Sequence, residues 1–339
     1  MPGLGRAGVG LMPEPLLTVR NLTTRFDTAG GQVLAVDNVS FTLDAGEVLG
    51  IVGESGSGKS QIFMSIAGLL ASNGTVSGEA VFAGRDLIKA GETTLNTIRG
   101  RELAFIFQDP MTALNPFRRI SSQLTEMLSL HRGLSHHAAR AEALRLLNRV
   151  RIPEAARRLD MYPHELSGGM RQRVMIAMAL SCSPKLLIAD EPTTALDVTV
   201  QIQVLDLINE LRRDEGLAVV LITHDMGVVA RLSDRILVVY AGNIVEQGRT
   251  EDVLLAPSHP YTAGLLASMP DINRPIEELV PVQGYPPDGR QARVGCMFAP
   301  RCGRVQQLCR AQTPAMTQSS SASHLQACHF PLREAGLVA

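Results

Sequence analysis

The sequence contains no tryptophan, and aromatic residues make up only 4% of its 339 positions. This scarcity argues against a surface that binds nucleic acid by stacking bases on aromatic rings. The charges also lack a dominant sign, because 32 Lys and Arg residues nearly balance 33 Asp and Glu residues. Domains that bind nucleic acid typically carry a basic excess, so the composition predicts no nucleic-acid partner.

Long apolar runs are also missing. A transmembrane helix needs about 20 predominantly apolar residues, whereas the longest apolar runs here, such as residues 217–222, have the length of a strand. Residues 1–15 are rich in Gly and Pro and lack the apolar segment of a secretory signal, so we expect a disordered tail. Met12 could also be the true start. These absences predict a cytosolic chain that acts at a membrane only through partner subunits.

The chain is organised around a glycine-rich segment that follows an apolar strand-like run and precedes a helix-like run. Strand, glycine-rich turn, Lys-Ser and helix in this order are typical of a P-loop. Backbone N–H groups of such a loop and of the helix N-terminus bind phosphate, the lysine reaches the outer phosphates, and the serine hydroxyl reaches Mg²⁺. The segment therefore predicts a site for a phosphate chain with Mg²⁺, formed by Gly53, Glu54, Ser55, Gly56, Ser57, Gly58, Lys59 and Ser60.

Polar residues follow three further strand-like runs, and ligands of open α/β sheets bind at such carboxyl ends of strands. Asp190 and Glu191 end one run; the first can hold Mg²⁺ through water, and the second can polarise an attacking water. His224 ends another run, where it can contact the γ-phosphate. Gln108 ends the third, where it can bind Mg²⁺, orient water, or be an ordinary loop amide.

Two more features belong to this central region. Residues 120–150 have helical periodicity and indicate a helical insertion in the α/β core. Ser167, Gly168 and Gly169 then open another helix. A serine N-cap followed by bare backbone N–H groups suits a second phosphate contact, although a plain helix cap explains it equally well.

These motifs in this order resemble the ATP-binding cassette (ABC) ATPases, from residue 16 to about residue 256. The resemblance implies that Ser167, Gly168 and Gly169 form the signature, although Met170 stands where the family usually has Gln. It places Asp197 in the D-loop and Phe26 at the adenine-stacking position, while the residues alone leave Phe26 either a core residue or a lid over a nucleobase.

The implied fold is an α/β P-loop NTPase core with an antiparallel β subdomain and a helical subdomain. We expect the ABC ATPase domain at 16–256, its helical subdomain at about 110–165, and a small cysteine-containing extension at 257–339. The resemblance further implies that ATP is bound between two subunits. Lys59, Ser60, Gln108 and Asp190 contact it from one chain, and the Ser-Gly-Gly segment contacts it from the other. Glu191 would then act as base, with His224 sensing the γ-phosphate.

Residues 107–116, 166–179 and 258–262 look like the ATPases of dipeptide and oligopeptide importers. This narrower resemblance implies a related second ATPase subunit in a heterodimer, two membrane permeases and an extracytoplasmic peptide-binding protein. The chain would lie peripherally on the cytoplasmic face of the inner (plasma) membrane. An importer for nickel or another small solute is the alternative, and a non-transport ABC ATPase is a further one.

Five cysteines are present, and four of them cluster in the extension. Cys182 lies in an apolar helix and is expected to be a small core residue. Cytosolic proteins rarely use structural disulfides, so the cluster suggests metal, but it lacks the Cys-x-x-Cys pairs of common zinc sites. Iron–sulfur, zinc and free thiols all remain open from the residues. The resemblance implies a [4Fe–4S] cluster, with Zn²⁺ as the alternative, on Cys296, Cys302, Cys309 and Cys328.

Overall fold

The structure is a computed structural model that describes residues 14–109, 113–193, 197–268, 282–290, 293–319, 321 and 323–332. The expected tail at 1–15 lies almost entirely outside these ranges. Within them, no helix combines the length and the apolar character that crossing a membrane requires.

A mixed sheet forms the centre of the molecule, with the strand order β11-β12-β10-β9-β3-β8-β7-β6. The strands from β9 to β6 are parallel neighbours, whereas β9, β10, β12 and β11 pair antiparallel. Both faces of the parallel part are covered, which explains the continuous apolar sequence of its strands. The bounds are β3 (Val48–Val52), β6 (Leu103–Ile106), β7 (Leu186–Asp190), β8 (Ala218–Thr223), β9 (Arg235–Tyr240), β10 (Asn243–Arg249), β11 (Thr317–Gln318) and β12 (Leu325–Gln326).

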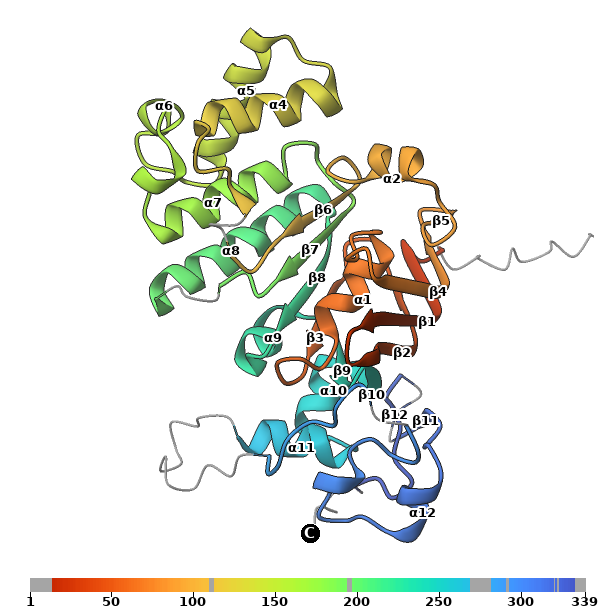
Figure 1. The fold of residues 1–339 in the computed structure, drawn as a ribbon. Coiled ribbons are helices and arrows are strands. Elements are labelled where there is room, and N and C mark those ends of the chain that lie inside the picture. Colours follow the sequence, from red (N-terminus) through yellow and green to blue (C-terminus); the bar gives the residue numbers. More distant parts are fainter. Residues whose placement is uncertain are drawn as a thin grey trace, which may run out of the picture.

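An antiparallel sheet covers one face of this central sheet (Figure 1). Alternate side chains of β8 show the two faces: Val220 and Ile222 join the core shared with the antiparallel sheet, whereas Val219 and Leu221 join the core shared with the helices. This division follows from the period-two alternation of side chains along a strand. The second sheet has the order β2-β1-β4-β5, with β1 (Leu17–Thr28), β2 (Gly31–Leu43), β4 (Gly74–Phe82) and β5 (Arg85–Asp86).

Helices form the rest of the molecule, and α4 to α7 gather at one end of it (Figure 1). Their apolar residues, such as Leu124 and Leu147, pack in one core with Ile106 of β6. The helices of the nucleotide-binding part are α1 (Lys59–Ile66), α2 (Glu92–Ile98), α4 (Ile120–Arg132), α5 (His136–Arg149), α6 (Ala155–Arg158), η1 (Pro163–Glu165), α7 (Gly168–Ala179), α8 (Val198–Glu215), α9 (Met226–Leu232) and α10 (Thr250–Leu255).

The chain after α10 extends the central sheet at the opposite end from α4–α7 (Figure 1). Its strand β12 pairs with β10, and its aromatic residues Tyr261 and Phe298 pack against Tyr240 of β9 with ring centroids 4.6 and 5.3 Å from that tyrosine. The described part of this extension therefore shares both a sheet and an apolar core with the nucleotide-binding part. It contains α11 (Pro260–Ala267), η3 (Ala299–Arg301), α12 (Gln307–Ala311), β11 and β12.

A buried polar cluster joins the same two parts. The Glu246 carboxylate on β10 accepts hydrogen bonds from the backbone N–H groups of Ser258 and His259, at 2.6 and 2.9 Å, and lies 2.7 Å from Nε2 of His324. His259 itself caps α11, because its Nδ1 accepts a hydrogen bond from the Tyr261 N–H at 3.1 Å. Burial lowers the pKa of His259 to about 4, although the nearby Glu246 carboxylate opposes the shift.

This buried histidine makes stability sensitive to acid. Unfolding exposes His259 and restores a pKa near 6.5, so the unfolded chain binds a proton that the folded chain excludes. The contribution is therefore lost as the pH falls from about 6.5 towards 4, and it amounts to about 2 kcal/mol between pH 7 and pH 5. Urea unfolding of His259→Asn, which keeps a capping acceptor, should show a correspondingly weaker pH dependence. The exposed-site control His136→Asn should follow the wild type, and equal slopes for all three proteins would contradict the assignment.

Candidate nucleotide-binding site

The segment from Gly53 to Ser60 forms a loop between β3 and the start of α1, as the sequence predicts. Three of its glycines have positive φ angles: 154° at Gly53, 76° at Gly56 and 98° at Gly58. A Cβ atom at Gly58 would lie 2.4 Å from the carbonyl oxygen of Ala35, and one at Gly53 would lie 2.2 Å from that of Val239. Glycine is therefore required at these two positions by both conformation and space.

Lys59 lies buried beneath this loop, with only 5% of its surface exposed. Its Nζ donates hydrogen bonds to the carbonyl oxygens of Gly53 and Glu54, both at 2.8 Å. Burial lowers the pKa of Lys59, and the carboxylates of Glu191, Asp190 and Glu54 partly oppose this effect. A desolvated ammonium group in such a place favours a bound anion.

The loop has further hydrogen-bond donors that could bind a phosphate group. Gly58 caps α1 without a side-chain hydrogen bond, and the first turn of the helix contains no acidic residue. The backbone N–H groups of that first turn have no acceptor within the helix, and they lie at its positive end. The hydroxyl of Ser57 is buried and makes no hydrogen bond to any described residue. These features match the oxygen-rich surface of a polyphosphate.

Four of the predicted site residues lie beside the loop: Gln108, Asp190, Glu191 and His224. Asp190 lies close to Ser60, and burial raises the pKa of its carboxyl group against the lowering effect of the Ser60 hydroxyl. Gln108 donates from Nε2 to Oε2 of Glu191 at 2.9 Å, and Nδ1 of His224 lies 3.2 Å from Oε1 of the same carboxylate. The ends of β6, β7 and β8 thus bring Gln108, Glu191 and His224 into one hydrogen-bonded group, as expected for neighbouring parallel strands.

Glu191 also has an unusual backbone conformation, with a φ angle of 46°. Positive φ is uncommon outside glycine and costs about 1–3 kcal/mol when the surroundings enforce it. The backbone N–H of Glu191 is held by the carbonyl oxygen of Ile222 on β8 at 2.8 Å. The strained turn directs the carboxylate towards Gln108 and His224, which is a typical arrangement for a functional residue.

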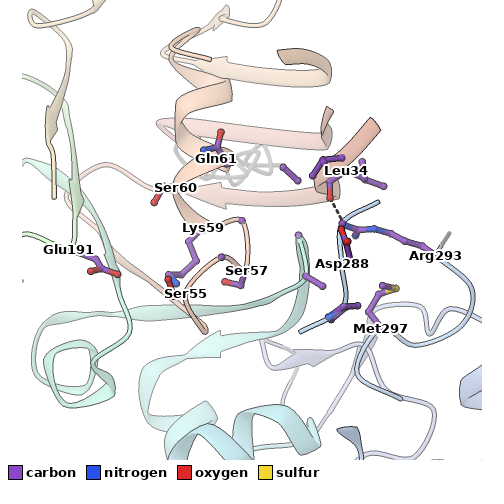
Figure 2. A pocket seen from close by; sticks show the side chains of 18 of the residues that line it. Leu34, Ser55, Ser57, Lys59, Ser60, Gln61, Glu191, Asp288, Arg293 and Met297 are labelled. Atoms are coloured by element: carbon purple, nitrogen blue, oxygen red, sulfur yellow. Dashed lines mark hydrogen bonds between the residues drawn. The ribbon is translucent and has the colours of Figure 1, made fainter. Parts of the chain in front are cut away.

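The loop borders a cavity of about 300 Å³ that also contains Gln108 and Glu191 in its wall. Figure 2 shows Glu191 on one side of the cavity and Asp288, Arg293 and Met297 on the other. These three residues belong to the extension. Arg293 donates from Nη2 to the Leu34 carbonyl oxygen at 2.6 Å, and the Leu34 N–H donates to the Gly289 carbonyl oxygen at 3.0 Å. No local sequence pattern predicts this second wall, because Arg293 and Leu34, which join across it, lie 259 positions apart in the sequence.

Comparison with known proteins identifies the family. The family model of the ABC transporter matches residues 36–194, and that of the oligopeptide/dipeptide transporter C-terminal region matches residues 245–309. The oligopeptide transport ATP-binding protein OppD of Salmonella typhimurium is 50% identical over 325 residues, which cover 95% of this chain and 96% of that protein. The chain belongs to the ABC transporter family. The dipeptide transport ATP-binding protein DppD of Escherichia coli is 46% identical over 322 residues, with 95% and 98% covered.

A solved structure of the ABC ATP-binding cassette MJ0796, a dimer bound to ADP and Pi, is 30% identical with a TM-score of 0.63. It covers 69% of this chain and 98% of the cassette. Together with the family matches, this likeness confirms the resemblance and the α/β P-loop fold that the motifs predicted.

The predicted signature residues lie on another part of the chain. Ser167 caps α7, its Oγ accepting a hydrogen bond from the Met170 N–H at 3.4 Å, and a Cβ atom at Gly169 would lie 2.7 Å from Val200 of α8. Asp197 caps α8 by accepting from the Val200 N–H at 3.0 Å. None of Ser167, Gly168, Gly169 and Asp197 belongs to the wall of the loop cavity.

Phe26, the predicted adenine-stacking residue, is also not part of the cavity wall. It is half-buried on β1, and its ring edge lies so near Gly74 that a Cβ atom there would be 2.8 Å away. The described cavity is bordered on that side by Val33, Leu34 and Ala35 of β2 instead.

The four clustered cysteines of the extension line one small cavity. Burial raises the pKa of Cys296, and it raises the pKa of Cys328 to about 11. None of the four forms a disulfide bond. Over the described ranges, however, no group of three or more His, Cys, Asp or Glu side chains is arranged to hold a metal ion. The structure therefore supports the predicted gathering of the cysteines but gives no support for a particular metal.

The close approach at Gly58 yields a testable consequence. Gly58→Ala should lower the free energy of unfolding by about 1–3 kcal/mol, because the new methyl group meets the Ala35 carbonyl and the φ angle is positive. It should also weaken binding of MgATP, which calorimetry can measure. Gly84→Ala is the control, since Gly84 has a φ angle of 78° with open space around it. Equal effects of the two substitutions on MgATP binding would show that the loop tolerates the methyl group.

Proposed function

We propose that this chain is the ATP-hydrolysing subunit of an ABC importer that takes up dipeptides or oligopeptides through separate membrane permeases. The observation that carries the ATPase activity is the contact of Glu191 with both Gln108 and His224, next to the cavity above Lys59. The peptide class is supported by the likeness to OppD and DppD and by the match to the oligopeptide/dipeptide C-terminal region. An importer for nickel or another small solute is the alternative.

Each residue of the site then has a chemical role. The phosphate loop and Lys59 bind the β- and γ-phosphates. Ser60, Asp190 and Gln108 would hold Mg²⁺, which supplies charge neutralisation on the phosphates when it is bound. Glu191 accepts the proton of the attacking water, and His224 orients that carboxylate and contacts the γ-phosphate. Gln108, Asp190 and Glu191 are preorganised by the ends of the adjacent strands β6 and β7, and Ser60 by the start of α1.

The second face of the nucleotide comes from another subunit in this proposal. Ser167, Gly168 and Gly169 begin α7 outside the loop cavity of their own chain, which supports a contact with ATP bound by a partner, and Asp197 would lie near the same interface. The partner is a related second ATPase subunit. Two permeases and an extracytoplasmic peptide-binding protein complete the importer, and the chain lies on the cytoplasmic face of the inner membrane. We assign residues 16–256 to the ATPase domain, with its helical subdomain at about 110–165, and residues 257–339 to the extension.

The decisive experiment substitutes the base. Glu191→Gln should retain MgATP binding and reduce ATP turnover by a factor on the order of 10²–10⁴, because a positioned general base contributes about that much. It should also trap the ATPase pair in a closed state, which size-exclusion chromatography with MgATP can detect. Glu251→Gln, at an exposed position of α10, is the matched control. Rapid ATP turnover by Glu191→Gln would refute the assignment of Glu191 as the base. The phosphate site is tested separately, because Lys59→Ala should lose ATP binding whatever the identity of the base.

We further propose that Cys296, Cys302, Cys309 and Cys328 hold a [4Fe–4S] cluster, with Zn²⁺ as the alternative. The support is that four thiols border one cavity, and four thiolates are the usual ligands of such a cluster. When bound, the group would cross-link the loops of the extension, and the residues offer it no role in hydrolysis.

Metal analysis of anaerobically purified protein tests this assignment. Iron and acid-labile sulfide should be present in equal amounts, with the broad visible absorbance of a cluster. Cys328→Ser should lose this absorbance, whereas Cys182→Ser should keep it, because Cys182 lies on a different part of the chain. Colourless protein containing stoichiometric zinc would replace the cluster by zinc, and metal-free protein would leave the four residues as free thiols.

A further inference from the structure

The extension contacts the phosphate loop directly through an ion pair. Arg301, the last residue of η3, donates from Nη1 to Oε2 of Glu54 at 2.6 Å and from Nη2 to Oε1 at 2.8 Å. Glu54 is the second residue of the loop. Such a bidentate contact fixes the orientation as well as the position of the carboxylate, because the guanidinium and the carboxylate are both planar.

The guanidinium is held firmly on its own side of the contact. Only 4% of the Arg301 side chain is exposed, and the guanidinium carbon lies 5.7 Å from the ring centre of Tyr240 and 5.9 Å from that of Phe298. Its remaining donors reach the carbonyl oxygens of Gln283 at 2.8 Å and Val282 at 3.0 Å. The arginine is therefore a rigid part of the extension, not a freely moving surface residue.

The same residue of the loop is held through its backbone. The N–H of Glu54 donates to the hydroxyl of Tyr261 on α11 at 2.9 Å, and its carbonyl oxygen accepts from Nζ of Lys59 at 2.8 Å. The side chain and the N–H of Glu54 are thus bound by the extension, and the carbonyl is bound by the lysine that faces the phosphates. A displacement of Glu54 would change the position of Lys59.

We propose that Arg301 is a positioning residue for ATP: through Glu54 it holds the phosphate loop in its binding conformation, so that nucleotide affinity depends on the extension. This inference rests on the proposed ATP site. It concerns binding of the nucleotide more than its hydrolysis, because the side chain of Arg301 binds Glu54 of the loop, whereas Gln108 and His224 contact Glu191. An arginine that only fastened the extension to the core would alter stability without altering nucleotide affinity.

The test measures binding of a fluorescent, non-hydrolysable ATP analogue with Mg²⁺ to the full chain. Arg301→Met and Glu54→Gln should each weaken binding about tenfold, and the double variant should be no weaker than the worse single variant, because the two residues act as one unit. Arg301→Lys should lie between the wild type and Arg301→Met, since lysine keeps the charge but loses the two-pronged geometry. Arg310→Met, at an exposed position of α12, is the matched control and should bind like the wild type.

Turnover by the assembled ATPase pair provides a second readout. The KM for ATP should rise with little change in kcat, because a positioning effect on the ground-state site is overcome by saturating ATP. If the variants keep their affinity for the nucleotide but melt at a lower temperature, Arg301 only attaches the extension to the core. If the losses of affinity add up in the double variant, Arg301 does not act through Glu54. A wild-type chain that fails to bind the analogue would instead refute the ATP site itself.

Discussion

The structure depends on a buried positive site that is built from a backbone loop and one lysine. Lys59 is buried, and its ammonium group donates hydrogen bonds to two backbone carbonyl oxygens. The N-terminus of α1 has backbone N–H groups that no side chain caps. Burying this positive charge without a partner costs free energy, and binding an anion beside it lowers the free energy, because charge interactions are stronger in a medium of low dielectric constant. Polyphosphate binding follows from this imbalance, and in our proposal the neighbouring carboxylates of Asp190 and Glu191 would make the binding site a site for metal-assisted hydrolysis.

Two different parts of the protein keep this loop in place. On one side, the strand ends of the parallel sheet place Gln108 and His224 within hydrogen-bond distance of the Glu191 carboxylate. On the other side, the extension holds Glu54 through Arg301 and Tyr261. The extension also adds strands to the central sheet, so its folding and the geometry of the nucleotide site are linked through shared packing.

The sequence was sufficient for the parts of the site that are local or that follow from sheet geometry. The phosphate loop is contiguous, and the residues at strand ends meet because parallel strands end at one edge. The Arg301–Glu54 contact could not be predicted, since 247 residues separate its partners and neither segment has a pattern that points to the other. The adenine contact of Phe26 that the family resemblance implies stays a prediction, because the structure shows only that its ring lies close to Gly74 and that Phe26 does not line the described cavity. The cysteine pattern predicted a shared location, but location alone does not determine which metal, if any, is bound.

Calorimetric comparison of ATP, ADP, AMP and adenosine binding to the wild-type chain with Mg²⁺ tests the central claim most directly. If the loop and Lys59 supply most of the binding energy, ATP and ADP should bind, AMP should be weaker by about a hundredfold or more, and adenosine should show no measurable binding. Comparable affinities for AMP and ATP would mean that the nucleoside, not the phosphate chain, is what this site recognises.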